Sequence, residues 1–126
     1  MFVSAHCYTA ISHACFSPII GKSFAEQVAS DTYKNYVLEI SSFQLDDIHK
    51  FAPHIAVLTN LSPDHLDRYN YSYENYIEAK FRITMNQTSR DYFIYDGDDD
   101  EINKWLETHE IKAKKLPFSL QREVDE

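Results

Sequence analysis

Three residues occupy positions where their side chains are unfavourable unless they are paired or take part in chemistry. Glu39 interrupts the apolar run Tyr36–Ile40. His65 comes soon after a second apolar run, Ile55–Leu58, and Lys80 lies among apolar residues at helical spacing. A carboxylate and an imidazole that converge on one crevice can hold a divalent metal ion, and Mg²⁺ needs few protein ligands because it keeps waters and phosphate oxygens. An inward-facing lysine must be paired, neutralised or chemically changed, since an isolated buried ammonium is costly.

Each of these residues also has a simpler interpretation. Glu39 is compatible with an ion-paired or solvated residue at a strand end, and His65 with a structural or exposed loop residue. Lys80 can extend its aliphatic stem along a core while its amine reaches water. Asp64 and Asp67, on either side of His65, are either turn residues or partners that orient the imidazole. The residues alone therefore leave a metal site and a structural role open.

The segments that would carry these residues alternate between strand and helix. Three short apolar runs have the composition of strands buried in a parallel sheet: Tyr36–Ile40, Ile55–Leu58 and Tyr92–Tyr95. The predicted helical segments are Lys22–Ser30, a turn or short helix in Phe43–Lys50, Tyr73–Asn86, and a helix capped by Asp98 or Asp99 that runs to about His109. This order predicts an α/β fold with a mostly parallel sheet and flanking helices. In such folds ligands bind at the carboxyl ends of strands, where Glu39 and His65 would both lie.

The two later helices are predicted to bury one face each. In the helix over residues 73–86 the apolar stripe, which also holds Lys80, consists of Tyr73, Tyr76, Ile77, Phe81 and Thr84. In the last helix the inward residues are Ile102, Trp105 and Leu106. The acidic run Asp98–Glu101 is explained better by the positive end of a helix dipole than by a second metal site.

Composition excludes several functional classes. The 126 residues, enough for one domain, include 20 acidic and 12 basic side chains with no basic stripe, which argues against nucleic-acid binding. The two cysteines, Cys7 and Cys15, have neither disulfide-framework nor zinc spacing, as expected of reduced thiols in the cytoplasm. No signal sequence and no run of about 18 apolar residues is present, so we expect a cytoplasmic protein without a membrane partner.

Three segments resemble motifs of the Mur ligase family, in the family's order and spacing. They are Glu39-Ile-Ser-Ser-Phe-Gln-Leu45, Leu58-Thr-Asn-Leu-Ser-Pro-Asp-His-Leu-Asp-Arg-Tyr69 and Tyr76-Ile-Glu-Ala-Lys80. The Asp-His-Leu-Asp and Tyr-x-x-x-Lys patterns are shared by several branches of the family. The first segment is similar to the branch that adds D-glutamate, because branches that add meso-diaminopimelate or lysine tend to have His-Gly in place of Phe43-Gln44. The similarity extends from about Gly21 to Asp99.

The resemblance implies an ATP-dependent ligase of peptidoglycan synthesis that uses ATP, UDP-N-acetylmuramoyl-L-alanine and D-glutamate. It forms an acyl-phosphate, and its metal cofactor is Mg²⁺ or Mn²⁺. By the same resemblance, Glu39 and His65 would be metal ligands, and His65 and Lys80 catalytic residues. Lys80 matches the family lysine that CO2 carbamylates, which would make it a further anionic group at the metal. The positions that match substrate-binding residues are Ser41, Gln44 and Tyr76.

The sequence departs from the family pattern near its start. The family's Gly-rich phosphate loop is absent, and no glycine precedes Gly21. Ile19 stands where the family has an asparagine, in Pro18-Ile19-Ile20-Gly21, and Asp96-Gly-Asp-Asp99 resembles the family's Asn-x-Asp-Asp stretch. We therefore expect residues 1–20 to be a non-native or disordered segment and residues 21–126 to be an incomplete central domain of the family. Without the phosphate loop and the other domains, we expect the chain alone to be inactive.

Three functional hypotheses follow from these observations. The chain is a fragment of the D-glutamate-adding ligase, or it belongs to another ligase of the same superfamily, such as the folylpolyglutamate type. The third hypothesis is a non-catalytic remnant that binds a metal, a nucleotide or another protein.

Overall fold

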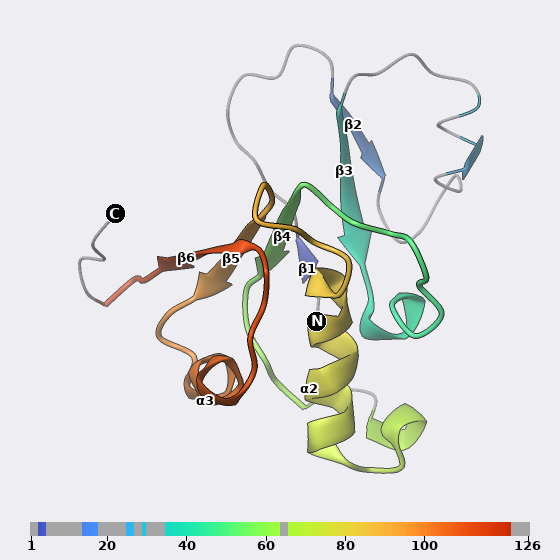
Figure 1. Ribbon diagram of the computed structural model, residues 1–126. Helices are drawn as coiled ribbons and strands as arrows, with labels where there is room; N and C mark the ends of the chain where they lie inside the picture. Colours follow the sequence, from blue (N-terminus) through green and yellow to red (C-terminus); the bar gives the residue numbers. More distant parts are fainter. Residues whose placement is uncertain are drawn as a thin grey trace.

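The computed structural model describes residues 3–4, 14–17, 25–26, 29, 35–63 and 66–121. The strands are β1 (Val3–Ser4), β2 (Ala14–Ser17), β3 (Asn35–Ile40), β4 (Ile55–Leu58), β5 (Tyr92–Asp96) and β6 (Lys114–Phe118). The helices with described bounds are α2 (Tyr73–Phe81) and α3 (Asp100–Thr108), with short 3-10 helices η1 (Ser42–Gln44), η2 (Leu66–Tyr69) and η3 (Arg82–Thr84). Strands and helices alternate from β3 onward (Figure 1), which confirms the predicted α/β class.

The described strands form two three-stranded sheets in which most pairs are parallel. β2 pairs with β3 in parallel and β1 pairs with β3 antiparallel, in the order β1-β3-β2. β4, β5 and β6 follow one another in parallel. β1 contacts β4, and Figure 1 shows it between β3 and β4, so the two sheets lie edge to edge. The prediction of a mostly parallel sheet is confirmed.

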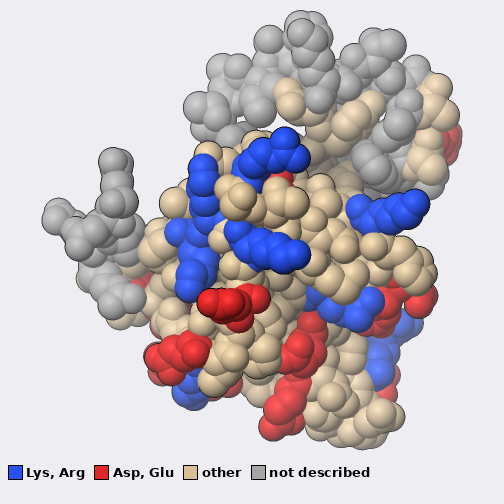
Figure 2. Space-filling view, in the orientation of Figure 1, with Lys and Arg blue, Asp and Glu red and all other residues tan. Residues whose placement is uncertain are grey.

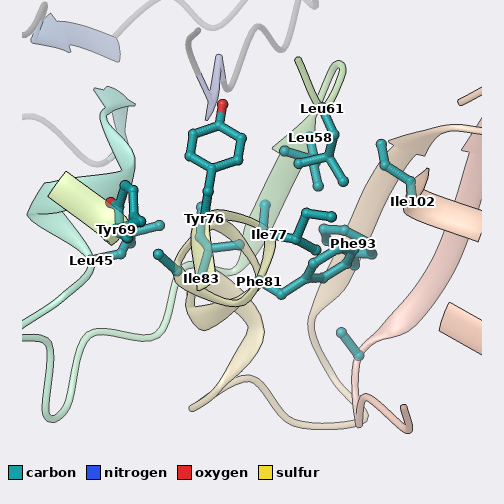
Figure 3. Close-up of a cluster of buried hydrophobic side chains, with 13 residues drawn as sticks. Leu45, Leu58, Leu61, Tyr69, Tyr76, Ile77, Phe81, Ile83, Phe93 and Ile102 are labelled. Atoms are coloured by element: carbon teal, nitrogen blue, oxygen red, sulfur yellow. The ribbon is translucent and has the colours of Figure 1, made fainter. Parts of the chain in front are cut away.

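The core lies between the sheet of β4, β5 and β6 and the two helices that cover it (Figure 3). Leu58 of β4, Phe93 of β5 and Ile102 of α3 are fully buried, each with 0% exposure. The ring of Phe81, at the end of α2, lies 3.7 Å from the ring of Trp105 in α3 and 5.7 Å from that of Phe93. These contacts bury the apolar stripe of α2 against β5 and α3, as its spacing predicted.

Most predicted elements are confirmed, with differences at their ends. β4 has the predicted bounds, whereas β3 begins one residue earlier and β5 ends one residue later than predicted. In residues 43–50 only η1 and a turn form. The predicted helix over 22–30 is described at residues 25–26 and 29, which are helical. The predicted boundary at residue 20 stays a prediction, because most of residues 1–20 lie outside the described part.

The helix predicted over residues 73–86 is an α-helix only as far as Phe81, after which η3 continues the chain. The Thr84 hydroxyl donates to the Phe81 carbonyl at 2.8 Å. The Met85 N–H donates to the Arg82 carbonyl at 3.0 Å, three residues back rather than four. These bonds tighten the last turn into the 3-10 form that often ends an α-helix. The spacing of apolar residues does not reveal the change from α-helix to 3-10 helix, because residues three apart lie on the same side in both.

β6 was not predicted, because Lys114-Lys-Leu-Pro-Phe118 carries charges and a proline that disfavour a central strand. The structure places it at the edge of its sheet. The Lys114 N–H donates to the Asp91 carbonyl, and the Phe118 carbonyl accepts from the Gly97 N–H, so alternate residues face β5. Pro117 is one of the residues whose backbone faces away from β5, toward the edge of the sheet. Its missing N–H therefore removes no hydrogen bond between the strands. Proline and lysine on an edge also discourage pairing with other chains.

The turn before β5 is organised around the carboxylate of Asp91. It accepts hydrogen bonds from the Thr88 N–H at 2.7 Å and the Thr88 hydroxyl at 2.9 Å, and it lies 3.0 Å from His54 Nδ1. The bond from His54, followed by those from Thr88, lowers the pKa of Asp91 from 3.8 to about 2. The ionised form is therefore favoured in the folded state.

We expect Asp91→Asn to reduce stability and to flatten its dependence on acid pH. Because the folded pKa of about 2 lies below the ordinary 3.8, the stabilisation from Asp91 is fully present above that ordinary value and is lost as pH falls through the folded pKa. Urea unfolding at intervals between about pH 5 and pH 2 measures this effect. The neighbouring variant Arg90→Lys serves as the control and should keep the wild-type slope. Equal slopes for wild type and Asp91→Asn would contradict the assignment.

Candidate functional site

The first part of the candidate site lies where β3 ends. Glu39, the penultimate residue of β3, is half-buried. The chain then turns at once: the Ser41 N–H donates to Gln44 Oε1 at 2.9 Å, and the Gln44 N–H donates to the Ser41 carbonyl at 3.1 Å. Gln44, predicted to bind substrate, therefore uses its side-chain oxygen to hold the turn. Ser41 and Glu39 are placed by this turn at the carboxyl end of the sheet.

The second part of the site is carried by α2. Ser72 caps the helix by accepting the Asn75 N–H at 3.2 Å. One and two turns later, Tyr76 and Lys80 are buried, with 2% and 1% exposure. Lys80 Nζ lies 5.3 Å from the centre of the Tyr76 ring, as expected for side chains four residues apart on a helix. The inward orientation predicted for Lys80 is confirmed.

Tyr76 belongs to a group of three tyrosines. Its ring lies 5.7 Å from that of Tyr69 in an edge-on arrangement and 6.0 Å from that of Tyr73 in a stacked one. Figure 3 shows the Tyr76 hydroxyl pointing away from Phe81 and Phe93. Burial raises the pKa of both Tyr69 and Tyr73. These hydroxyls therefore stay protonated at neutral pH and can donate hydrogen bonds.

Arg82 joins the two parts of the site. Its Nε donates to the Leu45 carbonyl and its Nη2 to the Asp46 carbonyl, both at 2.8 Å. α2 also contacts η1 directly. The helix that carries Tyr76 and Lys80 is thus attached to the segment that follows Glu39 and Ser41. Figure 1 shows the arrows of β3 and β4 pointing the same way, with α2 beside their tips.

Two more polar side chains extend this attachment along the connection from β3 to β4. Asn86 Nδ2 donates to the carbonyls of His49 at 3.1 Å and Phe51 at 3.0 Å. The buried Gln87 donates through Nε2 to the Pro53 carbonyl at 2.9 Å and to the carbonyl of Tyr92 at 3.0 Å. Sequence reasoning missed Arg82, Asn86 and Gln87, because the carbonyls that they bind between β3 and β4 lie more than thirty positions earlier and no local spacing marks such bonds.

His65 and Asp64 lie outside the described residues, so the convergence of His65 with Glu39 and Lys80 stays a prediction. The structure does describe the residues just before Asp64 and just after His65. Leu61 is buried, and Leu66 opens η2, where its carbonyl accepts the Tyr71 N–H at 2.8 Å. Asp67, also described, is exposed in η2. Within the described part of the chain, no group of three or more His, Cys, Asp or Glu residues is arranged to hold a metal ion.

The acidic run Asp98–Glu101 serves the fold, as its position at a helix start predicted. Asp99 is the N-cap of α3 and accepts the N–H groups of Glu101 at 2.9 Å and Ile102 at 3.1 Å through Oδ1. Asp96 Oδ1 accepts the Asp98 N–H at 2.9 Å. The side-chain oxygen of asparagine, the residue in the family's Asn-x-Asp-Asp stretch, could accept the same N–H.

Charges are separated on the face shown in Figure 2. Lysine and arginine side chains gather over its upper part and most acidic side chains over its lower part. The lower part is the end toward which the β3 and β4 arrows of Figure 1 point.

An open cavity of about 340 Å³ lies between the end of α2 and α3. Its lining includes Phe81, Met85 and Trp105, but none of the predicted site residues. Arg82, which attaches α2 to the segment after β3, also lines this cavity. In the part of the chain that the structure describes, no helix has the length and apolarity needed to cross a membrane.

Comparison with known proteins agrees with the motifs. A family model described as "Mur ligase middle domain" matches residues 5–126. The chain is 58% identical over 106 residues to the UDP-N-acetylmuramoylalanine–D-glutamate ligase of Christiangramia forsetii, and the matched region covers 84% of this chain and 24% of the relative. It is 55% identical over 104 residues to the ligase of that name from Bacteroides fragilis, where the matched region covers 82% of this chain and 23% of the relative. For Porphyromonas gingivalis the identity is 48% over 106 residues, covering 84% and 24%. The chain thus spans about a quarter of the length of these relatives.

We expect Arg82→Ala to lower the free energy of unfolding by about 2–3 kcal/mol, because two carbonyls lose a charged donor. Arg82→Lys keeps the charge but not the two-pronged geometry, and should cost about 1–2 kcal/mol. Urea unfolding measures both values. The exposed Arg90→Lys is the matched control, with an expected change within about 0.5 kcal/mol. An Arg82→Ala variant as stable as this control would show that the attachment contributes nothing.

Proposed function

Because the chain belongs to the Mur ligase family, we propose that it forms the metal-holding part of an ATP-dependent ligase that adds D-glutamate to UDP-N-acetylmuramoyl-L-alanine. The names and identities of the three relatives support this choice of substrate. They disfavour a ligase of the folylpolyglutamate type. We place the reaction in the cytoplasm, where ATP and UDP-linked substrates are found, and we propose neither nucleic acid nor a membrane as a partner.

The proposed reaction has two steps. A carboxylate oxygen of UDP-N-acetylmuramoyl-L-alanine attacks the γ-phosphorus of ATP, which forms an acyl-phosphate and releases ADP. The amine of D-glutamate then attacks the acyl carbon, the phosphate leaves, and an amide forms as the nitrogen loses a proton. Phosphoryl transfer of this kind depends on positioning and on stabilising charge at the transferring oxygens.

The observation that carries the proposal is the burial of Lys80 in a chain with these relatives. Lys80 has 1% exposure and ends the Tyr76–Lys80 segment, which matches the family's Tyr-x-x-x-Lys motif. We propose that the neutral amine attacks CO2, a nitrogen–carbon bond forms, and the amine proton passes to solvent. The product is a carbamate anion. Tyr76, whose ring lies beside Nζ, would shield this group from water.

The chemistry of the donors fits Mg²⁺ or Mn²⁺. Glu39 and a carbamylated Lys80 offer anionic oxygens, and His65 offers a ring nitrogen, while the remaining positions suit waters and phosphate oxygens. The metal, when bound, supplies positive charge that stabilises the oxygens of the transferring phosphoryl group. The chain's own part would be to present Glu39 from the end of β3 and Lys80 from α2, the helix that Arg82 attaches to the segment after β3.

Ser41, Gln44 and Tyr76 are the proposed substrate-binding residues. Ser41 is half-buried directly after β3, two residues beyond Glu39. The Oε1 of Gln44 holds the turn, so we assign any contact with substrate to its amide group. Tyr76 is proposed from its place in the Tyr-x-x-x-Lys motif; its hydroxyl is buried and points away from Phe81 and Phe93 (Figure 3).

A chimera tests the whole function. Residues 21–126 of this chain replace the matching segment of the Christiangramia forsetii relative, and ADP release is measured with ATP, UDP-N-acetylmuramoyl-L-alanine and D-glutamate. We expect release that depends on D-glutamate, and a loss of roughly 100-fold or more for Glu39→Ala or Lys80→Arg, since each removes a proposed metal ligand. The exposed Glu110→Gln is the control and should keep full activity. A folded but inactive chimera would favour the non-catalytic remnant.

The chain itself tests the lysine modification. We expect ¹³C-labelled bicarbonate to give a carbamate carbon signal in wild-type protein and none in Lys80→Arg, because arginine cannot be carbamylated. The exposed Lys112→Arg should keep the signal. Bicarbonate should also raise the affinity for Mn²⁺ in wild type but not in Lys80→Arg, as measured by electron paramagnetic resonance. A wild-type protein without a carbamate signal would contradict the modification.

A further inference from the structure

The ring of Tyr76 is in contact with two other tyrosines and with the amine of Lys80. Tyr73, one turn earlier on α2, is stacked on this ring, with 6.0 Å between the ring centres and 17° between the planes. Tyr69 comes from η2 and meets the same ring edge-on, at 5.7 Å and 73° (Figure 3). Lys80, one turn later on α2, places Nζ over the ring, 5.3 Å from its centre. The two neighbouring rings therefore limit how far the Tyr76 ring can turn or move away from Nζ.

Tyr73 and Tyr69 are themselves fixed to other parts of the structure. The Tyr73 hydroxyl donates to the carbonyl of Leu61, in the loop after β4, at 3.1 Å. The side chain of Tyr69 is 8% exposed and belongs to the core. Its carbonyl accepts the Ser72 N–H at 2.9 Å. Contacts outside the group thus hold the two rings that pack against Tyr76.

The position of the Tyr76 ring matters for the chemistry proposed for Lys80. A carbamate loses CO2 when a proton from water joins its nitrogen. The nitrogen–carbon bond then breaks, its electron pair stays on the nitrogen, and CO2 leaves the neutral amine. Lys80 is 1% exposed and Tyr76 is 2% exposed. A ring held over Nζ keeps water away from the nitrogen and so slows this loss.

We propose that Tyr69 and Tyr73 are positioning residues for Lys80: they hold the Tyr76 ring over Nζ and thereby slow the loss of CO2 from the carbamate. The inference rests on the proposed carbamylation of Lys80. Tyr71 offers a contrast, because it lies between the two positioning residues in the chain but is 80% exposed.

The test compares the loss of a ring with the loss of a hydroxyl, in the full chain. Tyr69→Leu and Tyr73→Leu each remove one ring beside Tyr76, and the half-buried Tyr73 is the position where this disturbs the core less. Tyr69→Phe keeps the ring and removes only the hydroxyl. Tyr71→Leu controls for the loss of a tyrosine ring outside the group. Ile102→Val controls for the loss of core packing, because Ile102 is fully buried in α3.

The first measurement is the rate of CO2 loss. Each protein is labelled with ¹³C-bicarbonate and diluted into unlabelled bicarbonate, and the decay of the carbamate carbon signal is followed by NMR. We expect about two- to tenfold faster decay in Tyr69→Leu and Tyr73→Leu, the change in rate that corresponds to one lost aromatic pair. Tyr69→Phe and both controls should decay at the wild-type rate.

The second measurement is the chemical shift of the Lys80 ε-CH2 protons, which are assigned by their absence in Lys80→Arg. Protons over the face of an aromatic ring resonate at lower frequency than usual, because of the ring current. We expect these resonances to move toward their ordinary position in Tyr69→Leu and Tyr73→Leu and to stay in place in Tyr69→Phe. This measurement needs no carbamate.

The two measurements separate this inference from the proposed modification. A wild-type carbamate that decays no more slowly than in Tyr69→Leu and Tyr73→Leu overturns the inference and leaves the modification intact. Equally fast decay in Ile102→Val or Tyr71→Leu overturns it too, since any loss of packing would then have the same effect. A wild type without a carbamate signal contradicts the modification and the slowed loss of CO2. The Lys80 resonances then decide whether the two tyrosines position the ring.

Discussion

Backbone carbonyl and N–H groups in the connections between strands must be paired, and this chain pairs them with side chains from segments much later in the sequence. A buried backbone group without a partner costs about as much as a lost hydrogen bond. The connection from β3 to β4 contains no long helix of its own, so several of its carbonyls are satisfied by Arg82, Asn86 and Gln87. The loop after β4 is satisfied in the same way by Asp99 and Tyr73. These bonds decide how the helices sit on the sheet.

The same bonds fix the elements that carry Glu39 and Lys80, two of the proposed site residues. Lys80 is buried because the apolar stripe of α2 faces the core, and it lies two residues before the arginine that ties α2 to the segment after β3. Glu39 lies at the end of β3, just before a turn closed by Ser41 and Gln44. The costly residues are therefore attached to rigid elements rather than to free loops.

The elements with strong hydrophobic patterns were predicted well from the sequence. β4, β5 and α3 were placed nearly as observed, and Asp99 was one of the two predicted caps. β6 was missed because charges and a proline are acceptable on an edge strand, and the sequence does not say which strand is at an edge. The end of α2 was missed because the change to η3 depends on a hydrogen bond by Thr84. Of the candidate site, the burial of Lys80 and the strand position of Glu39 were predicted, while Arg82 and the second role of Asp99 were not.

Sequence alone determined the α/β class, the strand that carries Glu39 and the inward face that carries Lys80. It also determined the family to which the chain is similar. Periodicity and motif spacing are properties of neighbouring residues, so they need no coordinates. Tertiary structure alone decided which distant side chains satisfy which loops: Arg82 with Leu45 and Asp46, and Asp99 with Leu61. Hydrogen bonds between residues 36 to 38 positions apart leave no periodic trace, because they depend on how the sheet and helices pack and not on neighbouring residues.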